Sequence, residues 1–252
     1  AASELDERLL TTPPVALEQC KKVAAEMANC SVTALRQSIS VLSRYTPELA
    51  KQIRAAEDLT DHYEDILGTY LVKLSTRRIS AADSNEAARL LKIIGDFERI
   101  ADHAVNLLQS AEELHEKKMS LSKPAVKELG VLTGAVDEIL GLSLDAFLKD
   151  DYSAAGMVEP LEQVIDGLKE QLRTNHILRL QKEQCSIEAG FVWSDLLTNL
   201  ERVSDHCSNI AGCVMDMHEG KLNLHESLRA VKEDREKFAE RFEQYQKKYA
   251  VQ

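Results

Sequence analysis

One stretch of the sequence occurs twice, and this duplication limits the possible folds more than any other feature. Residues 98–107 read ERIADHAVNL and residues 201–210 read ERVSDHCSNI. Glu, Arg, Asp, His and Asn recur at matching places, with a spacing of 103 residues from Glu98 to Glu201. Conservative exchanges such as Ile for Val lie between them. A repeat of this kind predicts a duplicated structural unit.

Apolar residues recur at steps of three and four along almost the whole chain, which is typical of amphipathic helices. Only 10 Gly and 5 Pro interrupt the 252 residues, too few for a sheet protein with many tight turns. Pro160 is compatible with a helix only near its start, and Gly220 is expected to stop the sixth helix. The six helices are expected over about residues 13–45, 47–76, 85–117, 122–149, 153–181 and 187–218.

Long helices joined by short turns predict an all-α protein made of two tandem antiparallel three-helix bundles plus an extra C-terminal helix. We expect an N-terminal linker over residues 1–14, the first unit over 15–119, the second unit over 120–220 and an amphipathic helix over 221–252. Apolar residues of that last helix follow a heptad register. We favour a helix that docks on the bundle through its aromatic stripe, and the alternative is a coiled coil or a contact with a partner. The apolar heptad positions are Leu228, Val231, Phe238, Phe242, Tyr245 and Tyr249.

The charge of the chain restricts its partners. A net charge of −11 disfavours nucleic acid and anionic membrane surfaces, because both need clustered Lys and Arg, and favours cations. The five cysteines are odd in number and show no C-x-x-C spacing, so we expect a reducing compartment. No apolar run approaches the roughly 18 residues that span a bilayer.

Acidic pairs four residues apart occur in matched places of the two units. Chance would supply roughly one or two E-x-x-x-D matches in a chain of this composition, yet four are present. Residues four apart share one helix face, and neighbouring helices of a bundle lie about 8–10 Å apart. We therefore expect four carboxylates to converge in each unit, an arrangement that is costly without a cation. The pairs are Glu57 with Asp61, Glu98 with Asp102, Glu162 with Asp166, and Glu201 with Asp205.

Oxygen ligands suit Mg²⁺, Mn²⁺, Ca²⁺ and iron rather than a structural zinc. An overfilled site would carry positive charge and attract phosphate. Asn106 and Asn209 extend the acidic face by one turn, whereas His103 and His206 flank it and are expected to be exposed or to support the ligands. The alternative is a metal-free structural scaffold whose acidic faces are solvated.

Features of enzymes are lacking in the sequence. It contains no Gly-rich phosphate loop, no G-x-S-x-G and no H-E-x-x-H motif. A di-iron centre of the ferritin type needs two Glu-x-x-His motifs, and only Glu112 to His115 matches. We therefore expect a binding module without catalytic residues.

The paired motifs ERIADHAVNL and ERVSDHCSNI resemble the PhoU family of phosphate-responsive regulators over about residues 15–218. The resemblance implies two three-helix bundles that hold divalent or trivalent ions, with iron, Mg, Mn or Zn as candidates, in clusters that can be multinuclear. Phosphate binding through the bound metal is a hypothesis that rests on the charge of an overfilled site. The implied ligands are Glu57, Asp61, Glu98 and Asp102 in one unit, and Glu162, Asp166, Glu201 and Asp205 in the other.

The opening stretch, residues 5–17 (LDERLLTTPPVAL), resembles the segment that follows the membrane domain in bacterial sodium/phosphate cotransporters with a C-terminal PhoU-like domain. The sequence also begins Ala1-Ala2-Ser3 without Met. The resemblance implies a transmembrane transport domain before Ala1 in the native chain, with this part as its regulatory domain on the cytoplasmic side of the cell membrane, active in phosphate transport and homeostasis. The alternative is a stand-alone PhoU-type regulator that contacts a phosphate uptake complex or a sensor kinase. Homo-oligomer formation is left open.

Overall fold

Seven long helices make up the computed structural model, which describes residues 5–219 and 224–252. The described residues contain no strand, so the predicted all-α class is confirmed. Gly220 and Ala1 to Ser3 lie outside the described residues, and the predicted domain borders stay predictions. The elements are the 3₁₀ helix η2 (Glu7–Thr11), α1 (Pro13–Ser43), α2 (Pro47–Ser75), α3 (Ala81–Glu116), α4 (Lys123–Lys149), α5 (Tyr152–Gln181), α6 (Ile187–Glu219) and α7 (Leu224–Lys248).

Short polar side chains fix where most of the long helices begin. Each accepts a hydrogen bond of 3.0–3.3 Å from the backbone amide three residues later, which satisfies an amide that has no partner within the helix. The capping residues of α2 to α6 are, in order, Thr46, Ser80, Ser122, Asp151 and Ser186.

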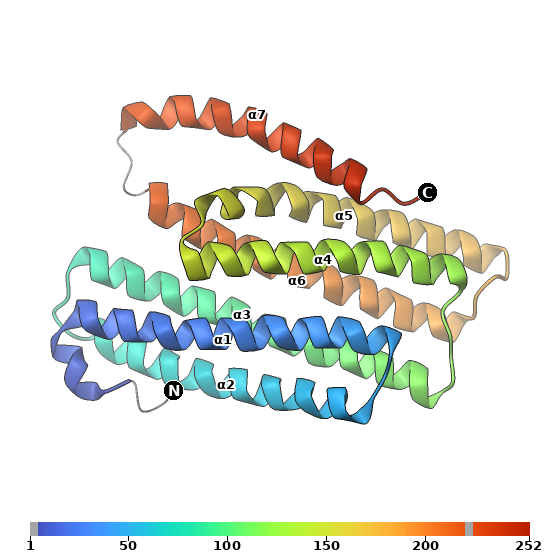
Figure 1. Cartoon of the computed structure of the whole chain (residues 1–252), viewed down its shortest axis with the longest axis horizontal. Coiled ribbons are helices and arrows are strands. Elements are labelled where there is room, and N and C mark those ends of the chain that lie inside the picture. The colour runs from blue at the N-terminus through green and yellow to red at the C-terminus, as the bar shows by residue number, and fades with distance from the viewer. Residues whose placement is uncertain (1–4, 220–223) are drawn as a thin grey trace.

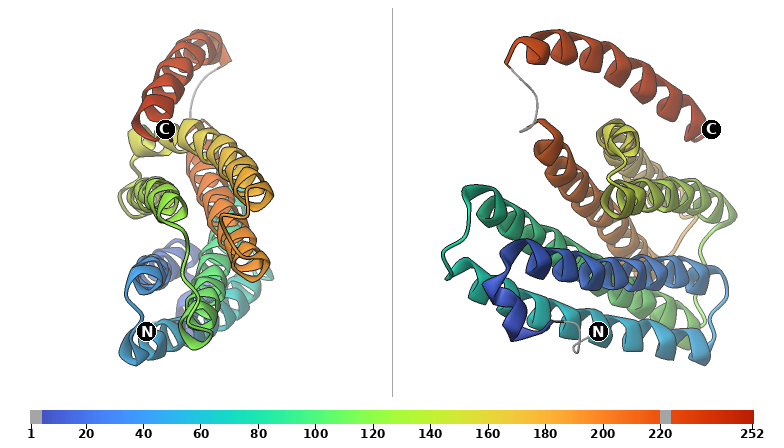
Figure 2. Two further views of the ribbon diagram at one scale, coloured as in Figure 1. Left: turned by 90° about the vertical axis from the view of Figure 1, so that its right-hand side faces the viewer. Right: turned by 60° about the vertical axis from the view of Figure 1, so that its left-hand side comes forward.

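The helices form two bundles that lie side by side. Helices α1, α2 and α3 pack on one another, and α4, α5 and α6 do the same (Figure 1). The bundles meet where α3 packs along α6, with a smaller contact between α1 and α4. Helices α2 and α7 lie on opposite sides of the molecule in all three views (Figure 2). The duplicated motif therefore lies on the two helices that join the units.

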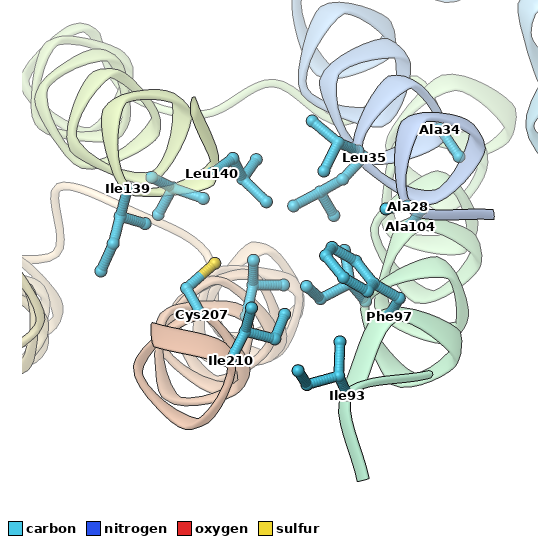
Figure 3. Packing of buried hydrophobic residues seen from close by; sticks show 14 of the residues in the cluster. Ala28, Ala34, Leu35, Ile93, Phe97, Ala104, Ile139, Leu140, Cys207 and Ile210 are labelled. Atoms are coloured by element: carbon cyan, nitrogen blue, oxygen red, sulfur yellow. The ribbon is translucent and has the colours of Figure 1, made fainter. Parts of the chain in front are cut away.

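One hydrophobic core runs through both units. Leu35 of α1, Phe97 of α3, Leu140 of α4 and Ile210 of α6 converge at the junction, and all are almost completely buried (Figure 3). The rings of Phe97 and Phe147 pack across the junction with centroids 5.4 Å apart. The two units thus share a core, so α1, α3, α4 and α6 form a central group with α2 and α5 outside it.

Pro160 lies eight residues after the start of α5, farther into the helix than the sequence predicts. A proline has no amide hydrogen, so the carbonyl of Gly156, four residues earlier, lacks its usual helical donor. Arg241 of α7 supplies the missing donor, because its Nη1 lies 2.8 Å from that carbonyl oxygen. A Cβ atom at residue 156 would lie 2.8 Å from the same Nη1, so glycine is what admits the guanidinium.

The aromatic stripe of α7 docks on the second unit. Tyr245 is 6% exposed, and Phe242 and Tyr249 pack against the core beside it. The Tyr249 hydroxyl donates to Glu138 of α4 at 3.0 Å, and Lys248 pairs with the same carboxylate. The predicted stripe therefore binds this chain itself. The side chains of Leu228 and Val231 lie outside the described residues.

Two further expectations from the sequence concern the cysteines and the lack of membrane-spanning segments. All five cysteines are free thiols. Among the described helices, none combines the length and the apolar character that crossing a membrane requires.

Candidate metal centre

The first unit brings its predicted acidic residues together between α2 and α3. Carboxylate oxygens of Asp61, Glu64 and Glu98 all lie within 4.8 Å of one another. Glu57 and Asp102 lie close enough for their charges to act on each other and on this group. We call these five residues the first-unit cluster: Glu57, Asp61, Glu64, Glu98 and Asp102.

Glu64 was not among the residues predicted from the sequence. The spacing of four residues that predicts the acidic pairs does not include Glu64, because Glu64 follows Asp61 by three residues. Residues three apart also share a helix face, so this spacing is the signal that would have found it. Its addition makes the first-unit cluster more negative than the expected group of four.

Burial, together with the neighbouring negative charges, raises the pKa of three carboxyl groups in the first-unit cluster. Burial raises the pKa of Glu98 to about 8, helped by its hydrogen bond to Asp102 and by the charge of Asp102. The pKa of Glu57 is also raised, first by burial and then by the charge of Asp102. Burial, followed by the charge of Asp61, raises the pKa of Glu64. Without a cation, the cluster is therefore stabilised by holding protons.

The second unit gathers Glu162, Asp166 and Asp205 in the corresponding place. Burial raises the pKa of Glu162 to about 8, followed by its hydrogen bond to Asp205 and the charge of Glu159. Glu159 also accepts a hydrogen bond of 2.5 Å from Ser208 of α6. We call Glu159, Glu162, Asp166, Glu201 and Asp205 the second-unit cluster.

Glu201 differs from the other predicted ligands because a lysine already pairs with it. Lys169 Nζ lies 3.2 Å from Glu201 Oε2, and the two side chains are only 13% and 15% exposed. Sequence reasoning missed Lys169, although it stands three residues after Asp166 just as Glu64 stands three residues after Asp61.

The geometry of the first unit fits a hard cation. Mg²⁺ and Ca²⁺ bind oxygen at about 2.0–2.6 Å, so oxygens on opposite sides of one ion are roughly 4–5 Å apart. The separation of at most 4.8 Å among Asp61, Glu64 and Glu98 agrees with this distance. The same place in the second unit holds an ammonium group. Metal binding by the predicted residues stays a prediction in both units.

The histidines and asparagines of the duplicated motif lie at the junction of the units instead of at the clusters. The rings of His103 and His206 face each other with centroids 5.5 Å apart. His103 Nδ1 lies 2.8 Å from Asn199 Oδ1, and His206 Nδ1 lies 3.0 Å from Asp96 Oδ1. The expectation of exposed histidines is therefore wrong, because His103 is 8% exposed and the side chain of His206 is 19% exposed. A role in supporting the ligands stays a prediction.

The junction is nearly symmetric. Asn106 Nδ2 donates to Asn199 at 3.2 Å, and Asn209 Nδ2 donates to Asp96 at 3.4 Å. Asp96 and Asn199 occupy matching places, two residues before Glu98 and Glu201. The acceptors of these hydrogen bonds differ between the two halves, because one half carries the Asp96 carboxylate and the other the Asn199 amide. Extending the repeat by these two positions would have revealed both acceptors.

Two three-helix units, each with an acidic cluster between its second and third helices, define a class of duplicated helical proteins. The family model described as PhoU domain matches residues 24–111 and 131–214, which together make up more than half of the chain. The chain belongs to the PhoU family.

Several known proteins are similar to this chain. The phosphate-specific transport system accessory protein PhoU homolog 1 of Thermotoga maritima is 25% identical over 199 residues, covering 79% of this chain and 84% of the relative. The PhoU homolog of Zymomonas mobilis, with the same accessory-protein name, is 27% identical over 202 residues, covering 80% and 84%. The crystal structure of PhoU from Pseudomonas aeruginosa superposes with a TM-score of 0.76 at 23% identity, covering 81% and 98%. That structural likeness supports the fold.

Proposed function

We propose that this chain is a metal-binding accessory regulator of phosphate transport. The observation that carries the proposal is the convergence of Asp61, Glu64 and Glu98 from two helices of a PhoU-family chain. The relatives named above as accessory proteins of the phosphate-specific transport system support the regulatory role. The proposal includes no catalytic step.

The charge of the first-unit cluster suggests which ions it would take. Its five carboxylates carry −5 when all are ionised, so two divalent ions leave −1 and two trivalent ions leave +1. Only the positive state attracts phosphate. Candidates are iron, Mg, Mn or Zn, and the positive state is reached by two iron(III) ions or by three divalent ions. In this proposal Glu57, Asp61, Glu64, Glu98 and Asp102 hold the ions, and phosphate binds to them.

The relatives favour a free accessory protein over a transporter tail. This chain covers 84% of the length of both relatives, and each is named an accessory protein of the phosphate-specific transport system. The partner would then be a separate phosphate uptake complex on the cytoplasmic side of the membrane, where free thiols are stable. A sodium/phosphate transport domain in the same native chain stays a prediction, and the genomic residues before Ala1 test it.

Metal analysis is the decisive experiment. Protein purified without chelator should carry metal detectable by elemental analysis, and Glu98→Gln with Asp102→Asn should remove most of the metal of the first unit. The matched control is Glu113→Gln with Asp145→Asn, because both residues form exposed ion pairs with lysines and neither belongs to a cluster. The control changes the net charge equally and should keep its metal.

The outcomes separate the candidate functions. A metal-free wild type that also binds no added iron, Mn²⁺, Mg²⁺ or Zn²⁺ would support the structural scaffold instead. Equilibrium dialysis with labelled phosphate should show binding only to the metal-loaded protein. In cells, the Glu98→Gln, Asp102→Asn variant should fail to restore regulated phosphate uptake to a strain that lacks the gene.

A further inference from the structure

The repeat aligns α2 with α5 as well as α3 with α6. Placing Glu57 and Asp61 on Glu162 and Asp166 pairs each residue of α2 with the residue 105 positions later. The carboxylates whose oxygens converge in the first unit then have direct counterparts in the second. Asp61, Glu64 and Glu98 correspond to Asp166, Lys169 and Glu201.

A lysine thus stands in the middle of a group that is all acidic in the other unit. Its ammonium lies 3.2 Å from Glu201 Oε2, at the distance of an ion pair, and both side chains are largely buried. An ammonium group has one positive charge and three donors but cannot accept. It therefore neutralises the carboxylate beside it and repels a second cation brought close to the same oxygens.

A second pair of matching positions, ten residues earlier on the outer helices, also carries opposite charges in the two units. Arg54 of α2 corresponds to Glu159 of α5. Arg54 Nη1 donates to Glu112 Oε2 at 3.2 Å, so in the first unit this positive charge is paired with a carboxylate outside the first-unit cluster. In the second unit Glu159 adds its negative charge to Glu162. The outer helices therefore carry a positive residue at different places: Arg54 pairs outside the first-unit cluster, whereas Lys169 pairs with Glu201 of the second-unit cluster.

We infer that the two clusters bind cations unequally: the first unit holds the exchangeable metal ion between Asp61, Glu64 and Glu98, whereas the ammonium of Lys169 takes that ion's place in the second unit. This inference rests on the proposed metal-binding function. The ligand is a hard divalent or trivalent cation, and the residue that determines where it binds is the one at position 64 or 169.

Exchanging the two residues tests the inference. Mn²⁺ is the probe, with free ion measured by electron paramagnetic resonance and bound ion by elemental analysis after dialysis. Glu64→Lys should lower Mn²⁺ affinity of the first unit at least tenfold. Lys169→Glu should add one bound Mn²⁺ per chain. Lys169→Met, which removes the charge but adds no ligand, is the matched control and should add less affinity than Lys169→Glu.

Substitution of Glu201 gives a second readout. Glu201→Gln should lower the Mn²⁺ affinity of the wild type far less than Glu98→Gln does, because Lys169 already pairs with the Glu201 carboxylate. In the Lys169→Glu background the same substitution should remove the added site. Circular dichroism and thermal melting establish that each variant is folded, and Glu64→Gln replaces Glu64→Lys if the lysine variant fails to fold.

Each result has a defined meaning. A wild type that binds no Mn²⁺ and no added iron, Mg²⁺ or Zn²⁺ overturns the proposed function and the inference together. A wild type that binds Mn²⁺ but loses as much of it through Glu201→Gln as through Glu98→Gln overturns the inference alone. So does a Lys169→Glu variant that gains no ion.

Discussion

Arg241 Nη1 donates a hydrogen bond of 2.8 Å to the carbonyl oxygen of Gly156, and this contact joins the C-terminal helix to α5. The acceptor is available because Pro160, four residues on, has no amide to offer it. Gly156, Pro160 and Arg241 therefore act together to dock α7 on α5, although Gly156 and Arg241 are 85 residues apart in the sequence.

We expect Arg241→Ala to loosen α7. The substitution leaves the Gly156 carbonyl without a donor, at a cost of about 1–3 kcal/mol. Amide hydrogen exchange in the C-terminal half of α7 should accelerate roughly tenfold or more. Lys247→Ala is the control, since Lys247 only pairs with Glu243 on the exposed side of the same helix. Equal exchange in both variants would contradict the docking role.

A double-mutant cycle isolates the role of the proline. Pro160→Ala restores an amide that can bond the Gly156 carbonyl within α5. Arg241→Ala should then accelerate exchange less in the Pro160→Ala background than in the wild type. Strict additivity of the two changes would show that Pro160 has no part in the docking.

The stability of metal-free protein should depend on pH through Glu98 and Glu162. Folding raises the pKa of each carboxyl from 4.5 to about 8. A group with a raised pKa contributes its full stability below pH 4.5 and loses it as the pH rises through about 8. In chelator, the melting temperature should therefore fall between pH 5 and pH 8.5. The variant Glu98→Gln with Glu162→Gln should show a flatter profile in differential scanning calorimetry.

The junction of the units should be sensitive to Asp96. Asp96→Ala removes the acceptor of both His206 and Asn209, so we expect a loss of about 1–3 kcal/mol in the free energy of unfolding. Asp96→Asn keeps an acceptor oxygen, as Asn199 does on the other side, and should cost less. Urea unfolding measures both. An alanine variant within about 0.5 kcal/mol of the wild type would mean that the junction is held by its apolar contacts alone.

A buried ion pair between α4 and α5 should be the most expensive polar contact to break. Glu128 accepts hydrogen bonds of 2.9 and 3.1 Å from the two terminal nitrogens of Arg179, and the side chains are 7% and 9% exposed. Glu128→Ala leaves a buried guanidinium unpaired, which costs about 3–5 kcal/mol. Glu113→Ala, which breaks an exposed pair with Lys117, should cost less than about 1 kcal/mol. Chemical denaturation of both variants checks this difference.

The fold was predictable because helical periodicity and the duplicated motif are local signals. Caps such as Ser122 and Asp151 lie within one turn of the helices that they begin, so the sequence specifies them directly. The continuous core was not predictable, since packing Phe97 against Phe147 depends on how two separate bundles meet. The position of Pro160 within α5 was not predictable for the same reason. Arg241, which donates to the Gly156 carbonyl that Pro160 leaves without a helical donor, comes from another helix.

The candidate site was predicted in part. Spacing of four found the acidic pairs, and α2 and α3 do bring Asp61 and Glu98 together. Glu64 and Lys169 were missed because only one spacing was searched, although comparing the units position by position would have found both. The roles of His103 and His206 could not be found in this way, because a residue 100° around a helix from a ligand can face solvent or a neighbour.

The division of the first-unit cluster between two helices has a mechanical consequence. Glu98 and Asp102 belong to α3, which is anchored in the core shared by both units, whereas Glu57, Asp61 and Glu64 belong to α2 on the outside. Under the proposed function, an ion entering or leaving between them would pull on one anchored and one peripheral helix. The displacement would then fall on α2, and we propose the outer surface of α2 as the place where a transport complex would sense whether the site is occupied.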